Sequence, residues 1–288
     1  MCWRPQGAIA RAIIVDEGQM ASEHPVDACD AVGDFAEWAL DEAMLVPGEL
    51  PEEALLLHDF SHYCGQVVNG GHAQFVKNAV KLCGELDLAI LARVGRLLDA
   101  VGARGHCGVF REFVAYLDAM PEAERGALAR TDLANFPARF EKLNRRFFGL
   151  EEDEDALWER VRQWLLGLPV LRKVPWDVTQ AERAAVIAAN PLRDARLAAA
   201  EAERAEAEAR DPVFTAMKTL CAAAGLEFVR FTSGHGSRAS YTVNFETSAG
   251  RRRLQIRDGR AHLIDDNGEF TGHSCECFAK FDGDAGWS

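Results

Sequence analysis

The segment 55–80, LLLHDFSHYCGQVVNGGHAQFVKNAV, decides how the first half of the chain folds. Apolar side chains recur at helical spacing in its first part, at Leu56, Phe60, Tyr63 and Val67. The residues Asn69–Gly71 tolerate a positive φ and predict a sharp end to that helix. Because the apolar pattern restarts at Phe75, the sequence predicts two helices that fold back on each other across a short turn.

A compact run of polar and glycine positions in this segment carries a family resemblance. Its residues are Asn69, Gly70, Gly71, Gln74, Phe75 and Asn78. The run resembles the NGG-x-x-QF-x-x-N signature of a family of bacterial DNA-mimic proteins, with His72 where the family usually carries an aromatic residue. The order of the predicted helices over about residues 30–175 resembles the family too. The resemblance implies a largely helical domain and, for the typical member, an acidic surface that imitates duplex DNA.

The negative charge gathers at one end of the chain. The formal net charge is −13, and residues 1–60 hold thirteen carboxylates against Arg4 and Arg11, whereas residues 213–288 hold nine residues of each sign. Such an acidic field repels nucleic acid and attracts basic protein surfaces. The alternative is a solvated acidic face that only keeps the protein in solution.

The predicted fold class is α+β, with a mostly helical N-terminal domain, a helical bundle, and a small C-terminal module of one helix and an antiparallel sheet. Four regions are expected: an extension over 1–29, the helical DNA-mimic-like domain over 30–176, an Ala/Glu/Arg-rich helical connector over 177–212 and an α+β domain over 213–288. The extension has no strong periodicity and is expected to be partly loose. A helix is predicted to begin at Asp34, where Glu37 completes a capping-box pattern.

The C-terminal module shows helical and strand patterns in turn. The predicted elements are a helix over 214–224 and strands over 226–232, 239–247, 252–257 and 260–264. Asp258-Gly259 predicts a tight hairpin between the last two strands.

Cysteine usage and hydropathy predict a cytoplasmic protein. The eight cysteines are scattered without any C-x-x-C pair, as is usual for small buried side chains in a reducing compartment. No stretch of about 18 apolar residues predicts a membrane helix. No cofactor is expected.

Three groups of histidine and cysteine residues suggest alternative chemistry. His58 and His62 could chelate a metal from one helix face, but no further ligands are evident, so a polar face is favoured. His235 lies in a glycine-rich stretch that could bind phosphate, and a hairpin loop is favoured there. The residues His273, Cys275 and Cys277 could form half of a metal site, but no second pair completes it.

Two charged runs are open to more than one interpretation. Arg251–Arg253, with Arg257 and Arg260 close behind, could contact nucleic acid, but the neutral module favours an ordinary solvated strand. The acidic run Glu151–Asp155 is interpreted as a loop that caps the next helix, or as a second part of an acidic binding face.

The resulting hypothesis is an interaction protein without catalysis, whose carboxylates stand in for DNA phosphates. The expected contributors are Asp34, Glu37, Asp41, Glu42, Glu49, Glu52, Glu53 and Asp59. The expected partner is a basic DNA-binding protein, a repressor or a nuclease. Direct contact with nucleic acid or membrane is not expected, and a homodimer is left open. Two alternatives remain: an immunity protein against a basic nuclease, and an enzyme that uses the face of His58, His62, Gln66 and Asn69.

Overall fold

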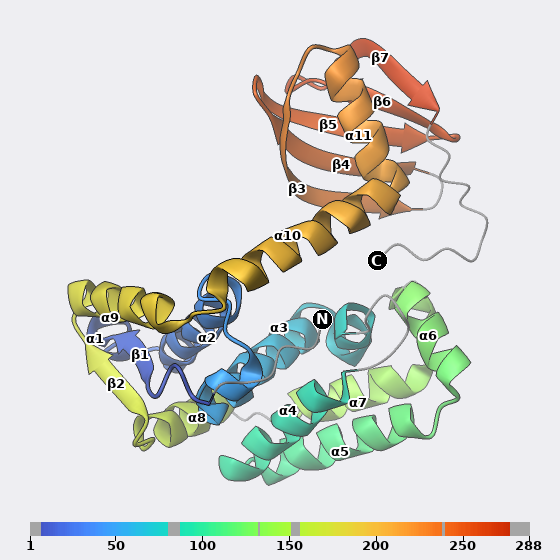
Figure 1. Ribbon diagram of the computed structural model, residues 1–288. Coiled ribbons are helices and arrows are strands. Elements are labelled where there is room, and N and C mark those ends of the chain that lie inside the picture. The colour runs from blue at the N-terminus through green and yellow to red at the C-terminus, as the bar shows by residue number, and fades with distance from the viewer. Residues whose placement is uncertain (1–6, 80–86, 132, 151–155, 238–239, 277–288) are drawn as a thin grey trace. The chain divides into compact units, whose positions relative to one another are not determined.

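The computed structural model describes residues 7–79, 87–131, 133–150, 156–237 and 240–276. They form two compact units that divide between Arg196 and Leu197. The first unit is built from helices and a two-stranded parallel sheet, and the second from most of a long helix, a further helix and a five-stranded antiparallel sheet (Figure 1). The predicted α+β class, with its helical N-terminal part, is confirmed.

The first unit contains thirteen short and long elements among the described residues, where η marks a 3₁₀ helix. In chain order they are β1 (Ile13–Asp16), α1 (Glu17–Met20), α2 (Pro25–Asp41), η1 (Pro47–Glu49), α3 (Glu52–Ala79), α4 (Leu88–Ala100), α5 (Arg104–Asp118), α6 (Glu122–Arg130), η2 (Leu133–Asn135), α7 (Ala138–Phe148), α8 (Ala156–Leu166), β2 (Leu171–Val174) and α9 (Trp176–Ala189). The next helix, α10 (Arg193–Arg210), begins in this unit and is separated from α9 by the residues Asn190, Pro191 and Leu192.

The N-terminal segment is packed rather than loose. Strand β1 pairs in parallel with β2, with Ile13 opposite Leu171. Both Ile13 and Val15 are fully buried. The expectation of a loose segment is therefore wrong for residues 7–29, because its apolar run pairs with a strand far along the chain that local periodicity does not reveal.

Helix α2 begins at Pro25, well before the predicted start at Asp34. A proline suits the first turn because the N–H that it lacks would have no partner there. The inner face of the helix is built largely from small residues, which carry a weak hydrophobic signal: Ala28, Cys29, Ala31, Val32, Phe35, Ala36 and Ala39. The predicted start is wrong for this reason, and Asp34 and Glu37 lie in the middle of the helix.

Helix α3 is folded in two at the glycine pair. The backbone leaves helical geometry at Gly70–Gly71, with φ of −162° at the first residue and 73° at the second. The ring centroids of Tyr63 and Phe75 are 5.1 Å apart, and Asn78 Nδ2 donates to Gln66 Oε1 at 2.6 Å. Each of these pairs would be separated by about 18 Å along a straight helix. The predicted fold-back is therefore confirmed.

The close approach of α7 requires glycine at position 71. The φ of 73° lies in the left-handed region that only glycine adopts without cost. Asn144 of α7 lies directly against this Cα, so that a Cβ at Gly71 would overlap the Asn144 amide. The same amide oxygen accepts a hydrogen bond from the backbone N–H of His72 at 2.9 Å. One side chain of α7 therefore holds the fold of α3 in place.

The His72 side chain completes this contact inside the core. Its Nδ1 lies 2.7 Å from Asn144 Oδ1, and its Nε2 lies 2.9 Å from the Tyr63 hydroxyl. Since the Asn144 oxygen only accepts, the ring nitrogen Nδ1 carries a proton and donates it to this oxygen. The ring packs among aromatic residues, with centroid distances of 4.9 Å to Phe113 and 5.8 Å to Phe147. Burial lowers the pKa of His72, although the hydrogen bond to Asn144 opposes this shift.

The second unit packs one helix on a five-stranded sheet. Its elements are α11 (Pro212–Ala223), β3 (Phe228–Ser237), β4 (Ser240–Thr247), β5 (Gly250–Arg257), β6 (Arg260–Ile264) and β7 (Phe270–Glu276), and the strand order is β3-β4-β5-β6-β7. Helix α11 lies across one face of the sheet (Figure 1). The Asp258-Gly259 hairpin is confirmed, with φ of 51° and 72° as a type I′ turn requires. The sequence did not predict β7.

The hinge of α3 can be tested by adding one methyl group. We expect Gly71→Ala to lower the free energy of unfolding by about 2–4 kcal/mol, since the left-handed backbone and the overlap with Asn144 both act against a Cβ. Gly65→Ala is the matched control, because Gly65 is exposed in the same helix and an added Cβ meets nothing within 4 Å. Denaturant unfolding should show a gain of about 0.5–1 kcal/mol for the control. Equal effects of the two variants would contradict the constraint.

A second test of the hinge uses pH. Because burial lowers the folded-state pKa of His72, the unfolded chain takes up the proton first as the pH falls below about 6.5. The free energy of unfolding should therefore decrease from about pH 7 to about pH 5. His72→Phe keeps a ring in the pocket and removes this titration, so its stability should depend less on pH. An unchanged pH dependence of the free energy of unfolding in His72→Phe would contradict the assignment.

Candidate functional site

Glu49 does not lie on an acidic surface, because it is fully buried at the end of η1. Its carboxylate accepts hydrogen bonds from Nη1 and Nη2 of Arg196 at 2.6 Å and 2.9 Å, and from the backbone N–H of Val46 at 3.1 Å. Arg196 is 4% exposed and also donates to the carbonyl of Met44 at 2.8 Å. The prediction that Glu49 contributes to an acidic surface is wrong, since Arg196 neutralises its charge inside the protein. This ion pair holds the start of α10 against the first unit.

Two carboxylates of α3 meet arginines from α4. Asp59 is buried, bonds to Nε of Arg93 and lies 3.1 Å from Nδ1 of His58. The prediction that Asp59 contributes to an acidic surface is therefore wrong as well. Glu52 is exposed but forms an ion pair with Arg96. Such an exposed pair adds little stability, yet it cancels the charge of Glu52 at the surface.

The remaining predicted residues lie on α2, directly after it, or in the first turn of α3. Asp34, Glu37 and Asp41 are exposed on the outer face of the helix. Glu42 is exposed and follows the helix as its C-cap residue. Glu53 is half-buried in the first turn of α3.

Two further carboxylates, Asp27 and Asp30, extend the same face of α2. Sequence reasoning missed them because it placed the start of the helix at Asp34. Together the exposed carboxylates recur at steps of three, four, three and four: Asp27, Asp30, Asp34, Glu37 and Asp41. At 3.6 residues per turn, the five share a strip that is roughly 80° wide and about 21 Å long. We call this row the α2 stripe.

The charges of the α2 stripe act on one another. Partial burial and the charges of Asp34 and Asp27 raise the pKa of Asp30. Asp27 accepts a hydrogen bond from the Ser22 hydroxyl at 2.5 Å. Within the part of the chain that the structure describes, none of the five carboxylates has a cationic nitrogen within 4.0 Å. The stripe is therefore a row of closely spaced charges that face solvent.

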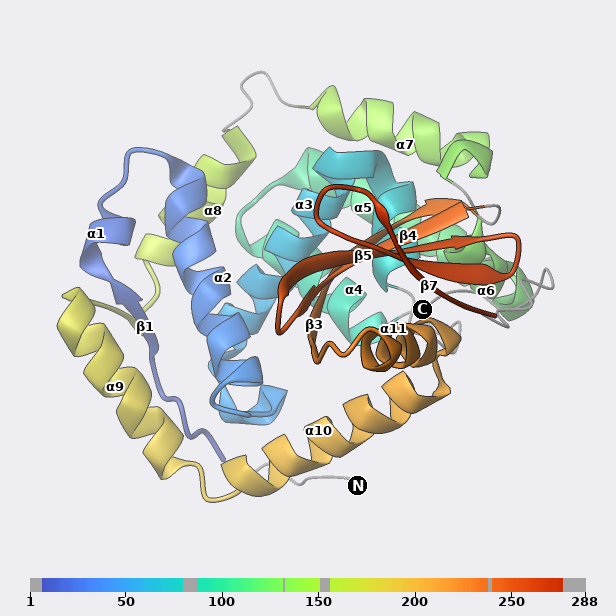
Figure 2. The ribbon, with the colours of Figure 1, turned by 90° about the horizontal axis from the view of Figure 1, so that it is seen from above.

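Packing holds the stripe in a fixed position on the first unit. Helix α2 lies against α3 and α8, as Figure 2 shows. Arg183 of α9 lies over the Trp38 ring at 5.0 Å from its centroid, and the charges of Asp34 and Glu42 act on it. A guanidinium thus borders the stripe at one side and partly screens Asp34. The other side chains of the stripe extend from a helix with a buried inner face.

The predicted alternative sites are not assembled in the described residues. His58 and His62 are neighbours on α3, but the Asp59 carboxylate between them is engaged by Arg93. His235 lies in strand β3, opposite Thr242, so the predicted hairpin loop at this position is wrong. The described residues contain no group of three or more His, Cys, Asp or Glu side chains that could hold a metal ion. Cys277 and the acidic run Glu151–Asp155 lie outside the described residues.

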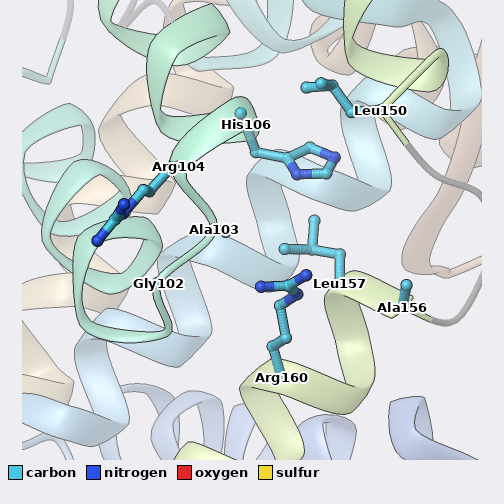
Figure 3. Close-up of a pocket in the computed structure, with 9 residues that line it drawn as sticks. Gly102, Ala103, Arg104, His106, Leu150, Ala156, Leu157 and Arg160 are labelled. Carbon is cyan, nitrogen blue, oxygen red and sulfur yellow. The ribbon is translucent and has the colours of Figure 1, made fainter.

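A hollow of about 330 Å³ opens between the start of α5 and the start of α8. Figure 3 shows His106 and Arg160 at its centre, with Arg104 directed away from them. Burial, and then the charge of Arg160, lower the pKa of His106, whose ring packs edge-on against Phe147 at 4.9 Å. The hollow is lined by none of the four polar residues that the enzyme alternative uses, so it gives that alternative no support.

These features define a class: a helical protein with a folded hinge and a row of surface carboxylates. Residues 48–167 match the family model described as DMP19-like protein. This is a family of DNA mimics, and the match confirms the resemblance that the NGG motif indicates. No curated protein and no solved structure shows a significant similarity to the chain.

Among the residues that the structure describes, no helix combines the length and the apolar character that are needed to cross a membrane.

The buried pair of Glu49 and Arg196 can be tested by its removal. Arg196→Met should lower the free energy of unfolding by about 3–5 kcal/mol, because the Glu49 carboxylate stays buried after the guanidinium is lost. Arg204→Met, at an exposed position of the same helix, should stay within about 0.5 kcal/mol of wild type. The double variant Glu49→Leu/Arg196→Met should recover part of the loss. Equal unfolding temperatures for the Arg196 and Arg204 variants would show that the pair does not fasten α10.

Proposed function

We propose that this protein acts as a DNA mimic, in which the α2 stripe stands in for one row of phosphates and docks a basic DNA-binding protein. The observation that supports this proposal most is the stripe itself. Five exposed carboxylates share one helix face, and among the described residues none of them is held in an ion pair. Of the remaining predicted contributors, Glu42 directly follows the stripe at the end of α2, whereas Glu53 lies in the first turn of α3.

The charge density of the stripe is comparable with that of a single DNA strand. Five carboxylates over about 21 Å give one charge per roughly 5 Å. One strand of duplex DNA carries a charge per about 3.4 Å of helix axis, and both strands together one per about 1.7 Å. The stripe therefore imitates one strand of the backbone, which long lysine and arginine side chains of a partner can reach. A rigid row of this kind favours fast and salt-sensitive association.

The family match supports the class of partner, and the geometry supports the surface. The stripe precedes the matched segment 48–167 in the chain. Helix α2 packs directly on α3 and α8, which both lie within that segment. The proposed docking surface is thus built on the frame of the DNA-mimic domain.

The proposal is tested by capture from a lysate of the cells that make the protein. The immobilised full-length chain is compared with Asp30→Asn/Glu37→Gln and with Glu201→Gln/Glu203→Gln, which removes two exposed charges from α10 instead. Wild type and the α10 variant should retain a basic DNA-binding protein that duplex DNA or added salt releases. The α2 variant should bind the same protein at least about tenfold more weakly, which corresponds to about 1.4 kcal/mol.

The controls separate lost binding from lost structure. Partial burial and the repulsion from Asp34 and Asp27 raise the pKa of Asp30, so neutralising this side chain removes an unfavourable charge, and the α2 variant should unfold at or above the temperature of wild type. A partner that stays bound at high salt, or that binds the α2 variant as well as wild type, would contradict the proposal. Inhibition of the captured protein's DNA cleavage would identify a nuclease, and loss of its operator binding would identify a repressor.

A further inference from the structure

The second unit has one sheet face that α11 leaves uncovered. Alternation along the strands directs Phe245, Leu254 and Leu263 toward α11, where they are fully buried. The residues between them point to the other face. The exposed or half-buried residues of this other face are Arg230, Thr242, Asn244, Glu246, Arg251, Arg253, Gln255, Arg257, Arg260, His262, Phe270, Ser274 and Glu276. We call this surface the open face.

Apart from Arg252, the described arginines of the neutral module lie on the open face. Three of them follow one another along β5 on this side: Arg251, Arg253 and Arg257. The first two are about 7 Å apart along the strand, and the last two are about 14 Å apart. Arg260 lies directly opposite Arg257 on β6. Within the described residues, none of Arg251, Arg253 and Arg260 has a carboxylate within 4.0 Å. The open face therefore carries a row of available cations, although the module as a whole is neutral.

Polar and aromatic side chains lie between these cations. Asn244 lies opposite Arg253 and accepts a hydrogen bond from its Nε at 3.3 Å. Gln255 and His262 are paired across β5 and β6. Next to them, Phe270 is 54% exposed, with its ring centroid 5.6 Å from that of His262. Side-chain amides can bond to base edges, and exposed aromatic rings can stack on bases.

A polar hollow lies beside β3, β4 and β5. It holds about 470 Å³ and is lined by Thr232, Ser233, Asn244, Phe245, Arg251, Arg252, Arg253, Asp265 and Asp266. The carboxylate of Asp265 is engaged by the backbone N–H groups of Asn267 and Glu269, at 2.9 Å and 2.8 Å. Asp266 lies 3.7 Å from Arg252. The arginines outnumber these carboxylates, so the hollow suits an anionic group.

We propose that the open face binds single-stranded nucleic acid, with phosphates along the arginine row of β5 and an unpaired base on Phe270. Five arginines against Glu246, Glu276 and the hairpin residue Asp258, which lies 3.8 Å from Arg257, leave the face with a positive charge, which is complementary to a phosphate chain. A duplex keeps its bases stacked and paired, whereas the exposed ring of Phe270 needs an unpaired base. This site uses none of the residues of the α2 stripe, so the two proposals fail or hold independently.

The test measures fluorescence anisotropy of labelled oligo-dT and oligo-U of about 15 nucleotides, a length near the upper site size of single-strand binders, with a duplex of equal length alongside. The full chain should bind at least one single strand at low salt and more tightly than the duplex. Arg253→Gln/Arg257→Gln should weaken binding at least about tenfold and reduce the slope of log K against log salt by about 1.4. Phe270→Ala should weaken binding roughly tenfold.

The control variant is Arg204→Gln/Arg210→Gln, which removes two exposed cations from α10 in the same unit. It should bind as wild type does. The proposal is overturned if neither single strand binds, if the duplex binds as tightly, or if the control loses as much affinity as the β5 variant. It is also overturned if no oligonucleotide binds and sedimentation shows a dimer for wild type that is lost only in the β5 variant. The open face would then bind an acidic surface of a second copy of the chain.

Discussion

The contact of Asn144 with Gly71 and His72 is the constraint on which the first unit depends. The Asn144 amide lies against Gly71, whose backbone conformation only glycine adopts easily. The amide oxygen accepts hydrogen bonds from both the backbone N–H and the ring Nδ1–H of His72. This contact fixes both halves of α3 relative to α7. Helix α2 in turn packs on α3. The position of the α2 stripe is thus tied, through two helix contacts, to a few atoms in the core.

Two groups of carboxylates in the first unit differ in their surroundings. Glu49 and Asp59 are buried, where an unpaired charge is costly, and each is engaged by an arginine from a later helix. The carboxylates of the α2 stripe face solvent, and Arg183 of a later helix interacts with Asp34 without forming an ion pair within 4.0 Å among the described residues. Acidic composition alone does not separate these groups. The separation comes from which carboxylates lie within reach of basic side chains after folding.

Net charge describes this protein poorly, because opposite charges are sorted onto different surfaces. The first unit carries the acidic stripe, and the second carries the arginines of the open face on a module whose formal charge is zero. The electric field at each surface depends on the charges nearby, since salt largely screens charges that are more than about 8–10 Å away. An overall value of −13 is therefore compatible with a cationic surface on the same chain.

Local patterns in the sequence determined the helical class, the fold-back at Gly70–Gly71, the Asp258-Gly259 turn and the family resemblance. Each of these depends on backbone preferences or spacing among neighbouring residues, which a linear sequence displays. Only the tertiary structure decided that β1 pairs with β2, that Glu49 meets Arg196 and that Asn144 closes the hinge. These partners lie far apart in the chain. Which carboxylates remain at the surface follows from such long-range contacts, so the site could be predicted only in part.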